Sequence, residues 1–347
     1  MNRRTRRTLL IVAAVLLMLV VAVFLRSKAP PEAARLLPES EGVLYVNLKP
    51  IRAFVPKNAK PPERVPEYQA FVDATGIDWE RDLDQVAIAM HRMPDPNGPN
   101  GPVAYSMVLV GKLTGNKLNA WLTAHATTRD SYAGKTIYNI PSEGRTVRVC
   151  QIGYDMVAVS NTPTPEQIHS MIDRHRAGAL PFSGSSILEK HYHEVPLLAF
   201  AWGVGQIGLP FSQSGAISIL GLELPLPADS TIIASLAPTL PITTTLHFQG
   251  LLRLRVEEIA KDASVAASQS MALGNLVALF QHISAPLADT PINNGFKQLV
   301  KTAQVTQHHD RVVITATFSP TVFTQAAALD QNSLPQSATG TAESASK

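Results

Sequence analysis

Three glycines with the spacing Gly203-x-Gly205-x-x-Gly208 follow an apolar run in the stretch LLAFAWGVGQIGLP, residues 197–210. This spacing occurs in dinucleotide-binding turns, where a helix must begin at the glycines so that its amino end can hold a pyrophosphate. Here Pro210 would fall inside the first two turns of that helix and disrupt it, although an acidic residue, Glu223, does follow a second strand-like run. We therefore interpret the glycines as a flexible or tightly packed loop and predict no cofactor.

Two histidines stand close together in EKHYHEV, residues 189–195, with Glu194 beside them. On a β-strand His191 and His193 would share one face and could bind one zinc ion, whereas on a helix they would point about 200° apart and could not. No third ligand is visible nearby in the sequence. We favour solvated histidines on a short helix and keep His191 and His193 as the candidate metal ligands. The similar run QHHDR, residues 307–311, is interpreted as a polar hairpin tip.

Other motifs that carry chemistry are missing from the sequence. It contains no GxSxG, no P-loop and no paired cysteines, and its only Ser-x-x-Lys runs from Ser344 to Lys347 at the end of the chain. The single cysteine, Cys150, lies in the strand-like run RTVRVCQIG and is predicted to be a buried thiol. One cysteine permits no disulfide within the chain. We predict no catalytic residue.

An uncharged apolar run of 17 residues extends from Leu9 to Leu25. It reaches the lower limit for crossing a hydrocarbon layer about 30 Å thick. Four arginines precede the run, and Arg26 and Lys28 follow it, so we expect the N-terminus in the cytoplasm and the rest of the chain outside the inner membrane. No small-residue cleavage site follows the run, which favours an uncleaved signal-anchor over a removed signal peptide.

The charge distribution separates this first segment from the remainder of the chain. Residues 1–28 carry six positive and no negative charges, which leaves 24 Lys and Arg against 27 Asp and Glu, a balance of −3. The sequence pI of about 8.9 therefore reflects the anchor. No basic footprint for nucleic acid remains, and we predict that the chain does not bind it.

Beyond the anchor the pattern is of the α+β class, with mainly antiparallel sheets and helices. Residues 29–40 form a tether rich in Pro and Ala, residues 41–210 a first lobe and residues 211–331 a second lobe of similar pattern. Residues 332–347 contain one large apolar residue, Leu334, and are predicted to be disordered.

Four helices are predicted after the anchor with clear boundaries or faces. One spans residues 65–77, with Gly76 as its C-terminal cap, and one spans residues 114–127, where Leu118, Trp121 and Leu122 share a face. A third spans residues 164–178, with Thr164 as the N-cap of a capping box. The fourth is a long helix over residues 264–283.

The run LLPESEGVLYVNLKPIRAF, residues 36–54, resembles the first strand of a group of uncharacterised bacterial proteins. Members of that group begin with a similar LP…Y(V/L)N(L/V) run after a single N-terminal membrane helix. The resemblance implies a membrane-anchored, extracytoplasmic α+β protein. It implies no catalytic residue, because no reaction is known for the group.

The sequence therefore predicts a single-pass membrane protein whose partner is the lipid bilayer, through residues 9–25. Its folded part is expected at the cell envelope, on the periplasmic side. We predict a non-catalytic binding or scaffold module rather than an enzyme. The alternative is a metal-dependent hydrolase that uses His191 and His193.

Overall fold

The structure is a computed structural model. It describes residues 29–54, 64–98, 101–113, 115–142, 144–178, 184–206, 216–219, 222–225, 230–239, 250–286 and 290–320. The predicted membrane run 9–25, the tail 332–347 and Gly208 lie outside the described residues, so the structure gives no support to the N-terminal membrane helix.

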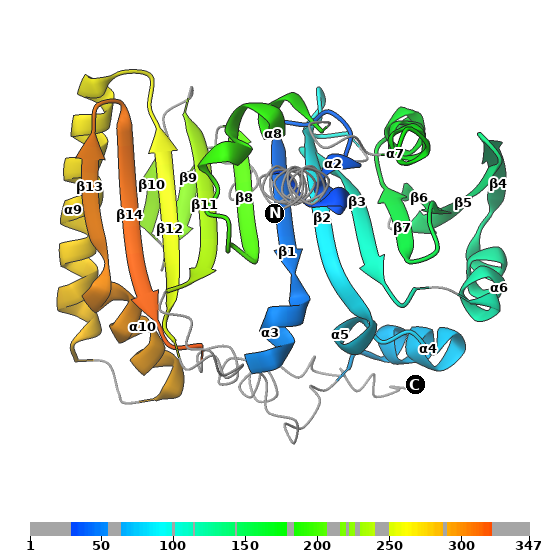
Figure 1. The fold of residues 1–347 in the computed structure, drawn as a ribbon, viewed down its shortest axis with the longest axis horizontal. Helices are drawn as coiled ribbons and strands as arrows, with labels where there is room; N and C mark the ends of the chain where they lie inside the picture. Colours follow the sequence, from blue (N-terminus) through cyan, green and yellow to red (C-terminus); the bar gives the residue numbers. More distant parts are fainter. Residues whose placement is uncertain are drawn as a thin grey trace, which may run out of the picture.

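The described residues form a mixed α+β protein around one antiparallel sheet of 12 strands, in the order β13-β14-β12-β11-β8-β1-β2-β3-β7-β6-β5-β4 (Figure 1). In chain order these strands are β1 Gly42–Asn47, β2 Leu83–Arg92, β3 Val103–Gly111, β4 Thr128–Tyr132, β5 Lys135–Ser142, β6 Arg145–Gln151, β7 Met156–Ser160, β8 Ala201–Gln206, β11 Thr231–Pro238, β12 Leu252–Ile259, β13 Gln304–His308 and β14 Arg311–Phe318. Two further strands, β9 Ala216–Ile219 and β10 Leu222–Pro225, pair with each other and form a second sheet among the described strands.

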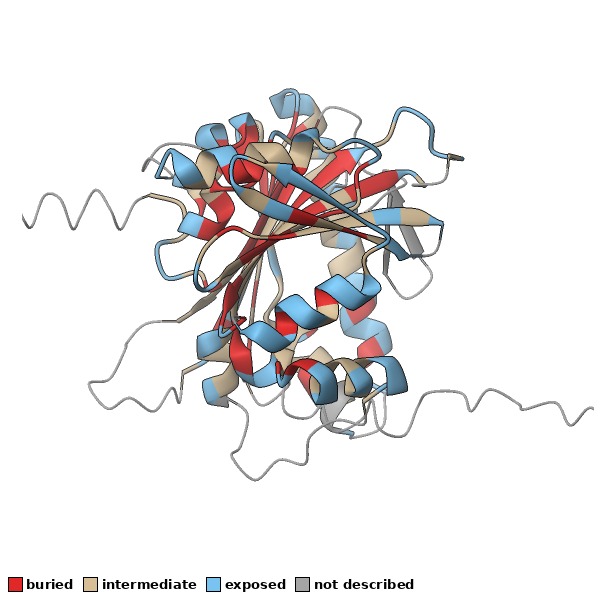
Figure 2. Ribbon diagram, turned by 90° about the vertical axis from the view of Figure 1, so that its right-hand side faces the viewer, coloured by how far each residue is buried: buried red, intermediate tan, exposed pale blue. Residues whose placement is uncertain are grey.

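One described helix precedes the first strand, the others lie between strands in the chain, and together they cover both faces of the sheet (Figures 1 and 2). They are α2 Glu32–Arg35, α3 Leu48–Phe54, α4 Pro66–Thr75, α5 Trp79–Asp82, α6 Asn116–His125, α7 Glu166–Arg176, α8 Ser186–His191, α9 Ala263–Ser284 and α10 Pro291–Thr302, with a 3-10 turn, η1, at Tyr192–Glu194.

Two runs of strands have the same order within this sheet. The first run is β1-β2-β3-β7-β6, and the second is β8-β11-β12-β14-β13. Between the third strand and the last two, the chain forms α6, β4 and β5 in the first run and α9 and α10 in the second. The runs meet where β1 pairs antiparallel with β8, so the sheet continues without interruption from one to the other. The predicted boundary at residues 210–211 stays a prediction, and the strand order groups β8 with the strands that follow it.

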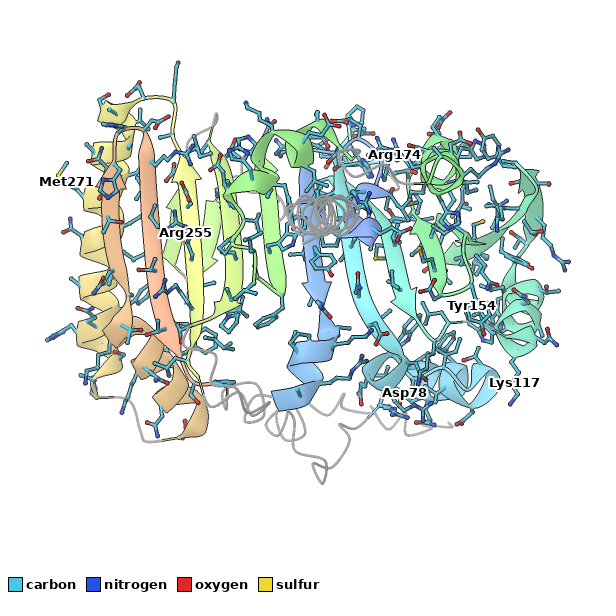
Figure 3. All side chains as sticks on the ribbon, viewed as in Figure 1. Asp78, Lys117, Tyr154, Arg174, Arg255 and Met271 are labelled. Atoms are coloured by element: carbon cyan, nitrogen blue, oxygen red, sulfur yellow. The ribbon has the colours of Figure 1, made fainter. Side chains whose placement is uncertain are left out.

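One face of the sheet, here called the α7 face, changes character along its width. Cross-strand pairing places one row of residues on it: Val108, Ala87, Tyr45, Trp202, Ser235, Arg255 and Thr315. Its apolar part is covered by α2, α7 and α8, and it contains the largest cluster of buried residues. At β12 and β14 the face becomes charged, and Arg255 stands on this outer part (Figure 3).

The opposite face, here called the α6 face, is apolar across the whole row. That row comprises Leu109, Val86, Val46, Ala201, Leu236, Leu254 and Ala316. At one end α4, α5 and α6 pack on this face, and at the other end α9 and α10 do. The sheet therefore has apolar surface to bury on this side even where the α7 face is polar.

The structure corrects the sequence analysis at three places. Gly203 and Gly205 lie inside strand β8, paired with β1 and β11, and not in a loop. An apolar strand that is buried on both faces accepts glycine where neighbouring side chains fill the space. The helix predicted over residues 164–178 begins at Glu166 and has no side-chain cap, so the predicted capping box of Thr164 is wrong. Strand β4, whose residues TRDSY are mostly exposed, was not predicted.

Candidate functional site

A cavity of about 570 Å³ lies on the α6 face, between α4, α5, α6 and the strands beneath them. Its lining is apolar apart from three residues, Glu67, Tyr68 and Ser142. The apolar lining consists of Val65, Phe71, Ile77, Trp79, Met107, Leu109, Leu113, Leu118, Trp121, Leu122, Ile140, Val147, Val149, Val157 and Val159. A cavity of this size is in the range that holds small ligands.

The floor of the cavity is a part of the sheet that the helices do not seal. Met107, Leu109, Val149 and Val159 keep intermediate exposure although their strands lie inside the sheet. Each Å² of apolar surface that stays in contact with water forgoes about 25 cal/mol of stabilisation. An apolar ligand that covered this floor would recover that free energy.

An aromatic cluster forms the wall of the cavity. Phe71 on α4 stacks on Trp79 of α5 with ring centroids 5.2 Å apart, and meets Trp121 of α6 edge-on at 5.1 Å. These rings join three helices, α4, α5 and α6. The stripe of Leu118, Trp121 and Leu122 predicted for the second helix packs in the core on this face and also lines one side of the cavity.

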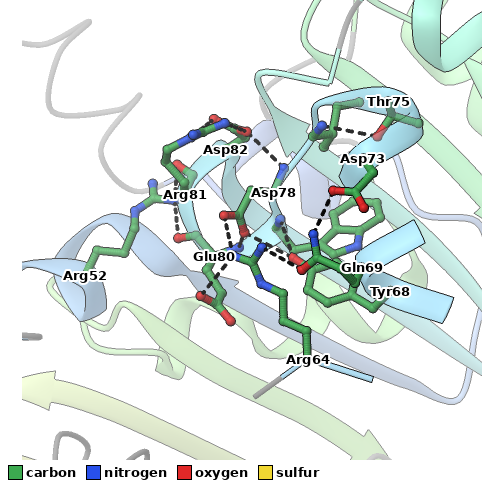
Figure 4. A network of polar contacts seen from close by, with 12 residues as sticks. Arg52, Arg64, Tyr68, Gln69, Asp73, Thr75, Asp78, Glu80, Arg81 and Asp82 are labelled. Atoms are coloured by element: carbon green, nitrogen blue, oxygen red, sulfur yellow. Dashed lines mark hydrogen bonds and ion pairs between the residues drawn. The ribbon is translucent and has the colours of Figure 1, made fainter. Parts of the chain in front are cut away.

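The corner between α4 and α5 is held by a polar network around Asp78 (Figure 4). Asp78 caps α5 by accepting from the backbone N–H of Glu80, and its carboxylate also lies 2.7 Å from Arg64 Nη2. The hydroxyl of Tyr68 donates to Asp78 and accepts from the backbone N–H of Trp79 at 2.9 Å. Burial, together with Asp78, raises the pKa of Tyr68 above its ordinary value. The network fixes Trp79 and Tyr68 in the lining.

The cavity has few groups that could perform chemistry. Of its three polar lining residues, Tyr68 is committed to Asp78 and Trp79, and Glu67 stands on an exposed position of α4. Proton transfer in catalysis needs a positioned acid or base within hydrogen-bond reach of the substrate. What this lining can do is remove an apolar chain or ring from water.

A second cavity, of about 600 Å³, has a mixed polar lining. It lies between the loop before β1, the end of β2 and α8, and two buried histidines, His91 and His191, line it. His91 shares a hydrogen bond of 2.9 Å with the fully buried Ser106, and burial lowers the pKa of His91. His91 is thus part of the sheet's internal polar contacts.

The candidate metal ligands are held on helical backbone, which is the arrangement that separates them. His191 ends α8 and is buried, while His193 lies in η1 with 73% of its side chain exposed. Glu194 is engaged by Arg311, whose Nη1 lies 2.5 Å from Oε2. Within the described ranges, no group of three His, Cys, Asp or Glu residues is placed to hold a metal ion.

Ion pairs connect η1 to the strands β12 and β14. Burial would raise the pKa of Glu194, but hydrogen bonds and charge from Arg311 bring it below its ordinary value. Burial lowers the pKa of His191. Arg311 also binds Glu257 of β12 at 2.7 Å. The residues around His191 therefore form an ion-pair network between η1, β12 and β14.

These features define a mixed α+β protein with a large antiparallel sheet and an apolar cavity beside it. No protein-family model matches the chain, and no curated protein matches it. Two crystal forms of a protein called TP0453 are similar in structure, with TM-scores of 0.42. The first is 12% identical in sequence, and the match covers 87% of this chain and 99% of that chain. The second is 10% identical, and the match covers 86% of this chain and 96% of that chain.

Proposed function

We propose that this protein is a non-catalytic binding module that holds one apolar chain, such as the acyl chain of a lipid, in the cavity on the α6 face. The observation that carries the proposal is the lining: 15 apolar side chains and three polar ones surround about 570 Å³. Ligand pockets are typically concave and apolar with a few polar groups that fix orientation. Glu67 and Ser142 supply such groups.

The membrane anchor is the second part of the proposal. The uncharged run of residues 9–25, preceded by four arginines, supports a single-pass protein of the inner membrane with its folded part on the periplasmic side. The equal order of the two strand runs supports two similar lobes that share one sheet. For the alternative, a hydrolase using His191 and His193, no described contact supplies a third ligand.

The tryptophans provide a direct test of the cavity. Trp79 and Trp121 line it, whereas Trp202 stacks on Tyr45 in another part of the fold. We would titrate the full chain, held in an amphipathic polymer, with a bromine-labelled fatty acid and follow tryptophan fluorescence. Saturable quenching with one ligand per chain is expected, and the fluorescence that remains should be that of Trp202.

A variant with a filled cavity is compared with a matched control variant. The double variant Val149→Phe/Val159→Phe places two rings on the floor, and Leu197→Phe/Leu251→Phe makes comparable changes at exposed apolar positions outside the cavity. The filled variant should bind roughly tenfold more weakly or worse, a change of about 1.4 kcal/mol. Absence of saturable quenching in the unmodified chain, or equal affinity in the filled variant, would show that the cavity is not the site.

A further inference from the structure

Helix α9 has the composition of a membrane segment but lies on the outside of the sheet. Its 22 residues include no Asp, Glu, Lys or Arg. By length and composition it could cross a membrane, and among the described helices it alone meets that test. A core helix of a soluble protein can meet the same test, but only 11% of the apolar window of α9 is buried. Its apolar character is therefore not explained by packing within the fold.

The two sides of α9 have different roles. Ala266, Leu273 and Phe280 face β13, β14 and α10, where Phe280 meets Phe296 edge-on. On the outer side, Met271, Leu279 and Ile283 are 66%, 45% and 40% exposed. Met271 points away from the sheet (Figure 3). A surface helix normally carries charged residues on its outer face, and this one carries none.

Two exposed lysines belong to segments that adjoin α9. Lys261 is exposed just before the helix, and Lys301 is exposed on the neighbouring α10. The nearest acid in the chain, Asp262, is already used as the N-cap of α9, where it accepts from the N–H groups of Ser264 and Val265. The outer side of α9 carries no charged residue and exposes the polar Ser264, Ser268, Asn275 and His282 beside its apolar side chains. Met271, Leu279 and Ile283, with two exposed lysines on adjoining segments, match the boundary of a lipid surface, where apolar side chains enter and lysines reach anionic headgroups.

The chain length before the fold brings a bilayer within reach. Leu25, the last residue of the predicted membrane run, is seven residues from Glu32, where α2 begins. Seven extended residues span no more than about 25 Å. The folded part would therefore stay close to the bilayer that holds the anchor, and lipid is the abundant apolar partner at its surface. The tether joins the fold at α2 on the α7 face, whereas α9 packs on the α6 face, so the contact of α9 is argued from its own exposed side chains.

We propose that the outer side of α9, with Met271, Leu279 and Ile283, lies in the headgroup–acyl boundary of the bilayer. The proposal rests on the membrane anchor of the proposed function and is independent of the cavity. The helix lies along the membrane surface and does not cross it, because its inner side stays packed on β13 and β14.

Site-specific labelling of the full chain tests this contact. Cys150 is fully buried and its pKa is raised to about 11 by burial, so it competes poorly for thiol reagents. Met271→Cys would be labelled with a polarity-sensitive fluorophore, and Tyr154→Cys serves as the control because Tyr154 is 86% exposed on the turn after β6. Each labelled chain would be reconstituted at no more than one copy per vesicle of phosphatidylcholine and phosphatidylglycerol.

The expected result is blue-shifted emission at position 271 and severalfold quenching by lipids with a spin label on the acyl chain. The label at position 154 should show neither effect. Vesicle flotation separates this proposal from the anchor: chains that fail to float disprove the anchor and, with it, the contact. Chains that float with a water-exposed label at position 271 disprove the contact alone.

A second copy of the chain is the competing partner for the same face. If the label at position 271 became shielded only when several copies shared a vesicle, the face would be an interface between copies and the lipid proposal would be wrong. Charged substitution gives a further check, because Leu279→Glu should reduce quenching of the label at position 271. Quenching that Leu279→Glu left unchanged would also contradict the proposal.

Discussion

Arg311 joins two carboxylates that have little access to water. Its guanidinium contacts Glu194 at 2.5 Å and Glu257 at 2.7 Å, while the side chains of these acids are only 10% and 5% exposed. The contact with Glu194 closes a loop of 117 residues and holds the segment after α8 against β14. The substitution Arg311→Met keeps much of the side-chain volume but removes the charge and all its donors.

The magnitude follows from what the substitution leaves behind. Removing one partner of a buried ion pair typically costs about 3–5 kcal/mol, because the other charge stays buried without compensation. Arg311 itself is 38% exposed, so water can reach part of the space it vacates. We expect a loss of about 2–4 kcal/mol in the free energy of unfolding at pH 7.

A nearby arginine provides the control. Arg255 lies 2.6 Å from Glu257 and is 37% exposed, but Arg255→Met leaves Glu257 in contact with Arg311. A pair of that kind is worth about 0–1 kcal/mol. Urea unfolding of the full chain in nonionic detergent, followed by circular dichroism, would measure both variants.

The dependence on pH adds a second criterion for the same variant. Because the pKa of Glu194 is lowered in the folded state, its stabilisation is present above its unfolded pKa, about 4.3. It is lost as pH falls through the folded value. The difference between the unmodified chain and Arg311→Met should therefore shrink as the pH falls below about 4.3. A variant that lost no more stability than Arg255→Met, or a difference that did not change with pH, would refute the reasoning.

Three further predictions concern buried groups. Burial lowers the pKa of His91. As the pH falls below about 6.5, the unfolded chain therefore binds this proton before the folded chain does, and the free energy of unfolding should decrease. Urea unfolding from pH 7 to pH 5 should show a smaller decrease for His91→Gln than for the unmodified chain. Cys150, with its pKa raised to about 11, should react with maleimide at pH 8 only in urea, and equal rates by mass spectrometry with and without urea would contradict its burial. In Gly111→Ala the new Cβ would lie 2.1 Å from the carbonyl oxygen of Asp82, whereas at Gly274 nothing lies within 4 Å. Gly111→Ala should cost about 1–3 kcal/mol and Gly274→Ala should be neutral or stabilising; similar unfolding midpoints for the two would count against the packing around Gly111.

Several elements could be predicted because a local signal defined them. Gly76 adopts a φ of 73° as the C-terminal cap of α4, a conformation that glycine takes without strain. The predicted helix over residues 264–283 corresponds to α9, and the hairpin tip at residues 307–311 is the turn between β13 and β14. The α+β class follows from such elements together.

The cavity could not be predicted, because it depends on contacts that no local pattern records. The sequence placed Leu118, Trp121 and Leu122 on one face of a helix, but a stripe of this kind looks the same over a closed core and over an open cavity. The aromatic contact of Phe71 with Trp79 and Trp121 joins three separate helices. Gly203 and Gly205 were misread for a related reason. A glycine spacing says nothing about the strands β1 and β11 that hold both residues in the sheet.

The two faces of the sheet explain why both proposed contacts lie on the same side. Along the α7 face the cross-strand row ends in Arg255 and Thr315, so exposing that end to water costs no hydrophobic free energy. Along the α6 face the row stays apolar to Ala316, and every part of it must be covered. Helices α4 and α6 cover one end incompletely and leave the cavity. Helices α9 and α10 cover the other end, but α9 then exposes an uncharged outer side of its own. The two proposals together place an apolar ligand and the bilayer on this one side of the protein. A fluorophore at position 271 should then be quenched by spin-labelled lipid. The fluorescence of Trp79 and Trp121 should be quenched by the bromine-labelled fatty acid, and that of Trp202 should not.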